Sequence, residues 1–139
     1  MAGGATTRSA KLKRLVKVQR HMEKMAEQEL AATTRHRAEV NEQKEVVIEA
    51  LGSLEPIHRQ FANHYAERYG RLTVKERQLA GVQQIQEMKV MKERTKGDRL
   101  EENMKEARDL EDRESADNAI YELIEMTLAA PASSKLQSS

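Results

Sequence analysis

Residues 12–61 read LKRLVKVQRHMEKMAEQELAATTRHRAEVNEQKEVVIEALGSLEPIHRQF, and the spacing of their apolar side chains decides the predicted fold. These side chains follow one heptad frame. Its first position falls at 12, 19, 26, 33, 40, 47, 54 and 61, and its fourth at 15, 22, 29, 36, 43, 50, 57 and 64. A frame held over this length is typical of a coiled coil. Polar residues interrupt the apolar pattern of this frame at Gln19, Glu29, His36, Gln43 and His64.

Two places compete for the turn that would fold this helix back. Gly52 and Pro56 are helix breakers, but the heptad frame continues across them, so we expect only a kink at 52–56. Gly70 suits the left-handed position that closes a helix, and a motif with capping-box spacing begins at Thr73. We therefore place the turn at Gly70.

The predicted fold class is all-α, a long two-helix antiparallel coiled-coil hairpin with frayed termini. Helix 1 covers about 9–69, the turn lies near 70–72, and helix 2 covers about 73–130. Residues 1–8 form a flexible leader and residues 131–139 a flexible tail.

The second helix carries a less regular apolar stripe. Its first part is expected to pack in the core together with most of the methionines, and a kink is expected near 95–98, at Gly97. The stripe strengthens again at 119–126, which a turn at Gly70 would place near Leu12–Met22. The first part of the stripe consists of Leu79, Val82, Ile85, Met88 and Met91.

Composition excludes several classes of function. The 139 residues include 24 basic and 23 acidic side chains, four aromatics and no cysteine, so disulfides, thiolate metal sites and cysteine nucleophiles are excluded. The histidines lack metal-ligand spacing, and the carboxylates are spread along helix faces without a cleft. We expect no catalytic residue, no cofactor and no metal. No apolar run has the length of a membrane span and no signal-peptide core is present, so we expect a soluble, cytoplasmic chain.

The first candidate partner-binding group is basic and contains no acid among residues 1–20. A coiled-coil arm with a solvated basic face is the favoured interpretation, with docking on an acidic protein surface as a second. Binding to nucleic acid or to a membrane surface ranks lower, because the net charge of the chain is only +1. Residues 101–125 are strongly acidic and would attract this group. Its members are Arg8, Lys11, Lys13, Arg14, Lys17 and Arg20.

The second candidate group is aromatic. Phe61, Tyr65 and Tyr69 are spaced by four residues and line one helix face just before Gly70. They either pack the hairpin tip or form a partner-binding patch, and both hold if Phe61 lies inside with the tyrosines partly outside.

The sequence resembles the FliJ family of flagellar export proteins and, more distantly, their counterparts in type III secretion. The resemblance covers residues 8 to about 128. It rests on the start LKRLVKVQRHMEKMAEQEL, on HYAERYGRL near the end of helix 1, on KGDRLEENMKEARDLEDRESADNAIYELI in helix 2, and on the size and two-helix plan.

This resemblance implies a non-enzymatic bacterial stalk between the export ATPase and the export gate, or an escort for export chaperones. The basic group with residues 115–128 would face the ATPase ring, and the aromatic group would face the gate or a chaperone. The chain would then be cytoplasmic and reach the inner membrane through the export apparatus. Two alternatives stay open: a generic coiled-coil adaptor or parallel dimeric scaffold, and a basic-helix nucleic-acid or membrane-surface binder.

Overall fold

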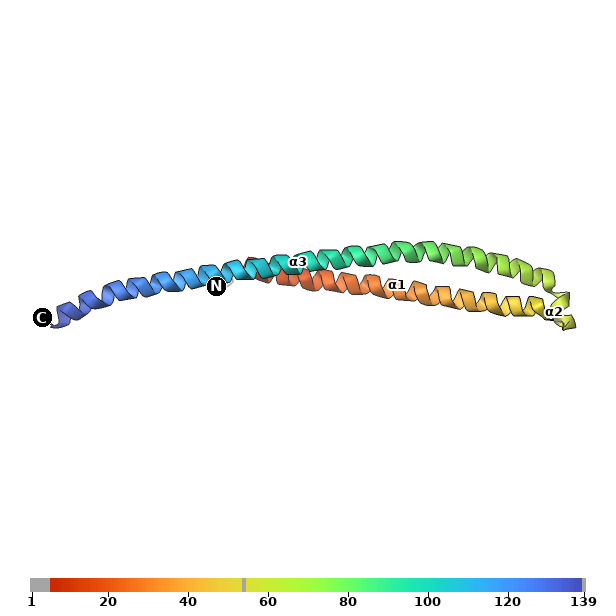
Figure 1. The fold of residues 1–139 in the computed structure, drawn as a ribbon, viewed down its shortest axis with the longest axis horizontal. Helices are drawn as coiled ribbons and strands as arrows, with labels where there is room; N and C mark the ends of the chain where they lie inside the picture. The colour runs from red at the N-terminus through yellow and green to blue at the C-terminus, as the bar shows by residue number, and fades with distance from the viewer. Residues whose placement is uncertain (1–5, 54, 139) are drawn as a thin grey trace. The chain divides into compact units, whose positions relative to one another are not determined.

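The computed structural model describes residues 6–53 and 55–138, which form three helices. Helix α1 spans Arg8–Gly52, α2 spans Pro56–Gln60 and α3 spans Ala62–Ser138 (Figure 1). No strand occurs among these described residues. The predicted all-α class is therefore confirmed.

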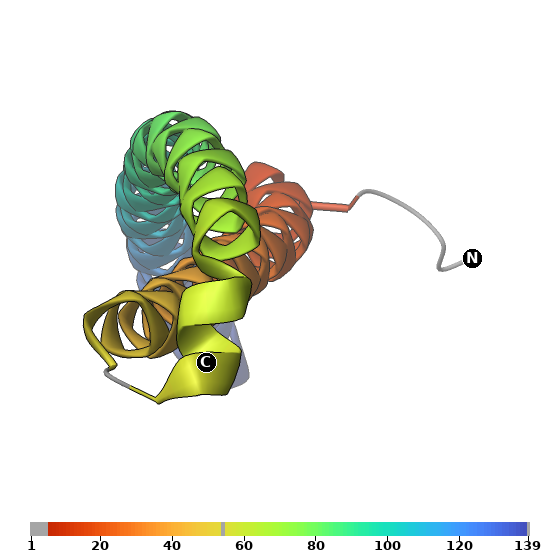
Figure 2. The same cartoon turned by 90° about the vertical axis from the view of Figure 1, so that its right-hand side faces the viewer.

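The chain divides into two compact units. One unit is Val18–Gly97, and the other, called the terminal unit below, is Met1–Lys17 together with Asp98–Ser139. In the Val18–Gly97 unit, α1 and α3 pack against each other and α2 lies where the chain turns (Figures 1 and 2).

Side-chain pairs between α1 and α3 define how the two helices align in the Val18–Gly97 unit. Their residue numbers rise along α1 and fall along α3, as in a helical hairpin. The pairs are Gln19–Glu93, Glu29–Lys89 and Arg37–Glu76.

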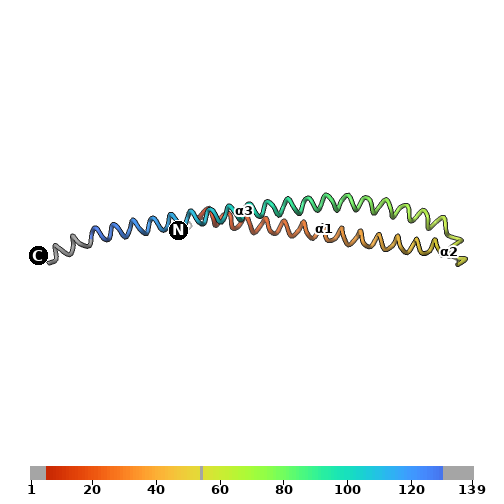
Figure 3. The backbone as a smooth tube through the Cα atoms, viewed as in Figure 1, coloured from red at the N-terminus to blue at the C-terminus, as the bar shows by residue number. Residues whose placement is uncertain are grey.

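The turn lies at residues 53–61, so the predicted turn at Gly70 is wrong (Figure 3). The backbone N–H of Glu55 donates to Ser53 Oγ at 3.2 Å, and Pro56 opens α2, where its missing N–H costs no helical hydrogen bond. Gly70 lies inside α3 without a positive φ. Residues 52–56, where the sequence predicted only a kink, therefore belong to the turn itself.

The other predicted boundaries shift with the turn. The first long helix ends at Gly52 rather than near 69, and α3 begins at Ala62 rather than near 73 and continues to Ser138 rather than ending near 130. Gly97 is a buried residue inside α3, and the helix is not interrupted there, so the kink near 95–98 stays a prediction. Residues 1–5 of the predicted leader, Leu54 and Ser139 lie outside the described residues.

On α1, the predicted heptad frame is right for its first position and wrong for its fourth. Four residues at its first position are buried: Gln19, Ala26, Val40 and Val47. The fourth position, by contrast, is exposed at residues 15, 22, 29, 36 and 43. The fifth position takes its place, because residues 16, 23, 30, 37 and 44 are half-buried. Apolar side chains such as Leu15 and Met22 therefore lie beside the α1–α3 interface rather than in it.

The interface side of α3 follows its own heptad spacing. Buried or half-buried residues recur at 62, 65, 69, 72, 76, 79, 83, 86, 90, 93, 97, 100, 104, 107 and 111. Of the predicted core stripe, only Leu79 belongs to this series. Val82, Ile85, Met88 and Met91 are exposed, so their assignment to the core is wrong.

Candidate functional site

The basic group covers the outside of the first turns of α1. Five of its members, which all belong to the terminal unit, are exposed: Arg8, Lys11, Lys13, Arg14 and Lys17. On the opposite side of these turns, Ser9, Leu12 and Val16 are half-buried. The five cations are therefore displayed together, along about three helical turns, to whatever approaches this side of α1.

Arg20, the sixth member, belongs to the Val18–Gly97 unit and is half-buried there. Its Nη1 donates to Glu23 Oε2 at 2.7 Å, and its guanidinium lies against the backbone of Gly97. Hydrogen bonds from Arg20 and then Arg94 hold the pKa of the Glu23 carboxyl below its ordinary value of 4.5. Arg20 therefore contacts residues of its own unit, unlike the five exposed cations.

The start of α1 is fixed by two sets of hydrogen bonds. Thr7 Oγ1 accepts from the backbone N–H of Ala10 at 3.2 Å, as an N-cap residue does. From α3, the Glu111 carboxylate accepts from the backbone N–H of Ser9 at 3.0 Å and from Ser9 Oγ at 2.5 Å. These bonds lower the pKa of Glu111, and its negative charge suits the N-terminal end of the α1 dipole. The contact between α1 and α3 in the terminal unit thus reaches Glu111.

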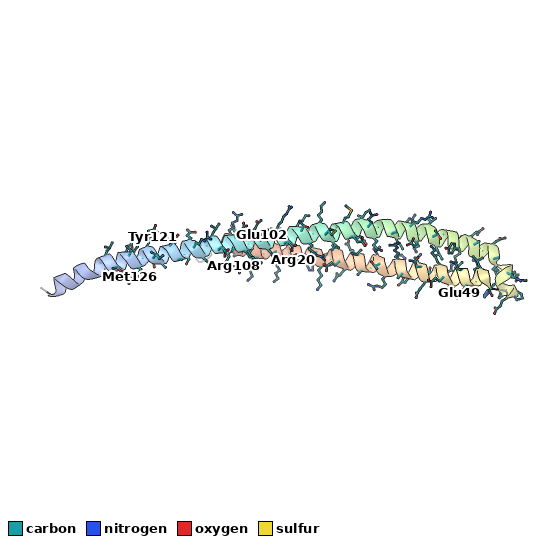
Figure 4. The ribbon with its side chains drawn as sticks, viewed as in Figure 1. Arg20, Glu49, Glu102, Arg108, Tyr121 and Met126 are labelled. Carbon is teal, nitrogen blue, oxygen red and sulfur yellow. The ribbon has the colours of Figure 1, made fainter. Side chains whose placement is uncertain are left out.

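Beyond Glu111, helix α3 has an exposed acidic and apolar segment, residues 112–128. Every residue in it is exposed, and it holds five carboxylates against one arginine. The side chains of Tyr121 and Met126 project from this stretch (Figure 4). Because the turn lies at 53–61 rather than at Gly70, the first turn of α1 meets α3 at Glu111, and residues 119–126, which were predicted to pack near Leu12–Met22, are exposed. The large apolar side chains of the segment are Ile120, Tyr121, Leu123, Ile124, Met126 and Leu128.

The aromatic group lies at the turn, but its inner and outer members are reversed. Phe61 is exposed, whereas Tyr65 and Tyr69 are half-buried on the interface side of α3. The His58 and Tyr65 rings meet edge-on with centroids 6.0 Å apart, and Lys44 Nζ lies 5.2 Å from the Tyr69 ring centroid. The expectation that Phe61 lies inside is therefore wrong, and Phe61 is the member of the group that a partner could reach most easily.

An acidic cavity of about 670 Å³ adjoins the aromatic group and was missed by sequence reasoning. Glu42, Glu45 and Glu49 line it, and their spacing on one face of α1 is the signal that could have located it. His58 also lines it, and His58 Nδ1 is buried without a hydrogen-bond partner among the described residues.

A second surface missed by sequence reasoning combines methionine and lysine side chains, and we call it the methionine surface. Two adjoining hollows that share Lys89 define it, one on α3 and one between α1 and α3. Both belong to the Val18–Gly97 unit. The methionine surface is formed by Met22, Met25, Ile85, Met88, Lys89 and Lys92.

Neither a cluster of metal-ligating side chains nor a membrane-spanning stretch occurs in the part of the chain that the structure describes. No three His, Asp or Glu side chains among these residues could hold a metal ion together. None of the described helices has an apolar stretch that could cross a membrane.

Comparisons with protein-family models, with curated proteins and with solved structures each find no significant match to this chain.

Proposed function

We propose that this chain is a non-enzymatic coiled-coil component of the bacterial flagellar or type III protein export apparatus. It would act as a stalk between the export ATPase and the export gate, or as an escort for export chaperones. The resemblance of residues 8–128 to the FliJ family motivates this proposal. The structural observation that carries it is the packing of α1 against α3, whose contacts Gln19–Glu93, Glu29–Lys89 and Arg37–Glu76 run in opposite order along the two helices.

The finer architecture that we propose is an antiparallel coiled coil. The interface residues of α3 recur in alternating steps of three and four from 62 to 111, which supports heptad packing. The pairs Glu29–Lys89 and Glu27–Arg94 flank this interface, as charges flank coiled-coil seams.

Two surfaces are proposed to receive the export partners. The basic outer face at Arg8–Lys17, together with residues 115–128, would contact the ATPase ring. Phe61, together with Tyr65 and Tyr69, would contact the gate or a chaperone, because exposed aromatic side chains are preferred interface anchors. The chain would be cytoplasmic and reach the inner membrane only through these partners.

A binding assay tests the function directly. The purified chain should capture the export ATPase and gate proteins of its own organism from a defined mixture, and deletion of its gene should impair motility or secretion. Failure of both capture and phenotype would remove the proposal.

A distance measurement tests the architecture separately, because the runner-up function is a parallel dimeric scaffold. Spin labels at positions 29 and 89 should be close within one chain, since packed helix axes lie about 10 Å apart. In a parallel rod of unbroken helices the same two positions would be separated by roughly 90 Å along the helix. A short intramolecular distance in the isolated chain favours the hairpin, and a long one favours the scaffold.

A further inference from the structure

The terminal unit holds an apolar helix face that the described residues leave uncovered. Ile120, Tyr121, Leu123, Ile124, Met126 and Leu128 are between 48% and 73% exposed. Ile120, Ile124 and Leu128 are spaced by four residues and share one side of α3, with Tyr121 beside them. A contiguous apolar face of this kind marks an interaction surface.

The α1–α3 interface ends at Glu111, before Ile120, where this apolar face begins. The contact of Ser9 with Glu111 involves the first turn of α1, which begins at Arg8, so α1 itself does not extend the interface farther along α3. Packing over residues 112–128 therefore needs a helix other than α1 of the same chain.

The charges of the terminal unit indicate which helix fits. Residues 112–128 carry five carboxylates and one arginine, whereas residues 8–17 carry five cations and no acid. Those five cations are exposed on the outer side of α1, where Leu15 is also 52% exposed. One copy thus displays an acidic apolar helix together with a basic surface that could receive it.

We propose that two copies of this chain form a symmetric dimer in which residues 112–128 of each copy pack on the outer face of residues 8–17 of the other. The two α3 helices run antiparallel with the twofold axis near residue 112. Each 8–17 segment then lies between its own 98–111 segment and the acidic segment of the second copy. The contact is isologous and closed, so it gives a dimer rather than a filament.

This inference is independent of the proposed export function, although the two would use the same residues. A dimer of this kind covers the surfaces proposed for the ATPase, so it would be a form of the chain that is not bound to that partner.

The experiment measures the mass of the full chain in solution against concentration and salt. We expect a concentration-dependent shift from the 15.9 kDa monomer to twice that mass, weakened by salt because charge pairing contributes. A chain that stays monomeric up to millimolar concentration would overturn the proposal.

Matched variants locate the contact. Ile120→Ser with Ile124→Ser should abolish the dimer while helix content is retained, because both side chains are exposed in the single chain. Ile85→Ser with Met88→Ser, which removes two still more exposed apolar side chains from the methionine surface, should leave the dimer unchanged. A dimer that responds to the second pair and not to the first contradicts the proposal.

Charge reversal tests the partner surface. Lys13→Glu with Arg14→Glu should weaken the dimer about tenfold or more at low salt. Addition of Glu122→Lys and Glu125→Lys to the same chain should restore part of the affinity. A dimer indifferent to both changes is not held by these segments.

Spin labels distinguish the antiparallel arrangement from any parallel one. Labels at position 112 of the two copies should be separated by roughly 20 Å, because one helix lies between the two α3 helices, whereas labels at position 126 should be separated by roughly 40 Å along the helices. Equal distances at the two positions indicate a parallel dimer and overturn the proposed symmetry.

Discussion

The guanidinium of Arg20 occupies the space beside Gly97 that a larger side chain would need. A Cβ added at Gly97 would lie 2.7 Å from Arg20 Nη1 and 2.9 Å from its Cζ. By contrast, a Cβ added at Gly81, also inside α3, would meet nothing within 4 Å. Gly97 is thus a site where the Arg20 side chain closely approaches α3.

Gly81→Ala and Gly97→Ala should therefore differ in stability. Glycine inside a helix costs about 1 kcal/mol relative to alanine, so Gly81→Ala should raise the free energy of unfolding by about that amount. Gly97→Ala should raise the free energy of unfolding by less, because Arg20 must move away from its position beside Glu23. Chemical unfolding followed by circular dichroism measures both values.

A double-mutant cycle isolates the role of Arg20 in this difference. In the Arg20→Ala background the guanidinium is absent. Gly97→Ala should then raise the free energy of unfolding by as much as Gly81→Ala does. Equal gains for the two glycine substitutions in the unmodified chain would show that Arg20 does not restrict position 97.

Val40 and Val46 offer a matched test of the interface position. Val40 is 2% exposed and Val46 is 65% exposed, although both lie in the same part of α1. Val40→Ala removes two buried methyl groups and should lower the free energy of unfolding by about 2 kcal/mol. Val46→Ala should change it by less than about 0.5 kcal/mol. A larger loss of stability from Val46→Ala than from Val40→Ala would mean that a different face of α1 forms the interface.

The sequence identified the helices and one heptad position, but not the side of α1 that completes the interface. Leu15 and Met22 are apolar and so looked like core, yet the half-buried position is held by residues such as Glu23 and Arg37. Arg37 Nε donates to Glu76 Oε1 at 2.6 Å, and this partner on α3 is what allows a cation near the interface. The spacing of apolar residues along one helix cannot reveal an ion-pair partner that another helix supplies.

The turn was misplaced for a related reason. The apolar frame runs through Val47, Ala50 and Ile57 without a phase change, which favoured a helix across Pro56. Pro56 is nevertheless compatible with the first turn of a new helix, and that local signal was the correct one. The misplaced turn shifted the expected pairing partners, so the exposed segment 112–128 could not be anticipated.

Gln86 is a weak point of the α1–α3 interface that a substitution should improve. Its Oε1 is buried and accepts no hydrogen bond from the described residues, and a buried polar atom without a partner is costly. Gln86→Leu should raise the free energy of unfolding by about 1 kcal/mol. Gln84→Leu at an exposed position is the control and should have little effect. A destabilised Gln86→Leu variant would mean that the amide has a partner in solution.

Acid should destabilise the fold through carboxylates whose pKa values are lowered. A hydrogen bond from Gln19, and then Lys96, lowers the pKa of Glu93, and Ser9 lowers that of Glu111, both from 4.5. The unfolded chain therefore binds more protons near pH 4 than the folded chain does. The resulting stability is present above about pH 5 and is lost as the pH falls through the folded pKa values.

Glu93→Gln provides the test of this pH dependence. The new amide can still accept from Gln19 but has no proton to take up, so the loss of thermal stability between pH 7 and pH 3.5 should be smaller than in the unmodified chain. Glu39→Gln at an exposed position is the control and should leave the loss unchanged. Identical acid profiles for Glu93→Gln and the unmodified chain would contradict the assignment to Glu93.

Phe61 and Tyr69 should separate partner binding from stability at the turn. Tyr69 is half-buried with Lys44 Nζ 5.2 Å from its ring centroid, so Tyr69→Ala should lower the free energy of unfolding by about 2 kcal/mol. Phe61 is 46% exposed, and Phe61→Ala should cost less than about 1 kcal/mol. If the aromatic group receives the export gate or a chaperone, Phe61→Ala should nevertheless reduce capture of that partner by the folded chain. Capture that is unchanged by Phe61→Ala, at full helix content, would assign the aromatic group to packing of the turn alone.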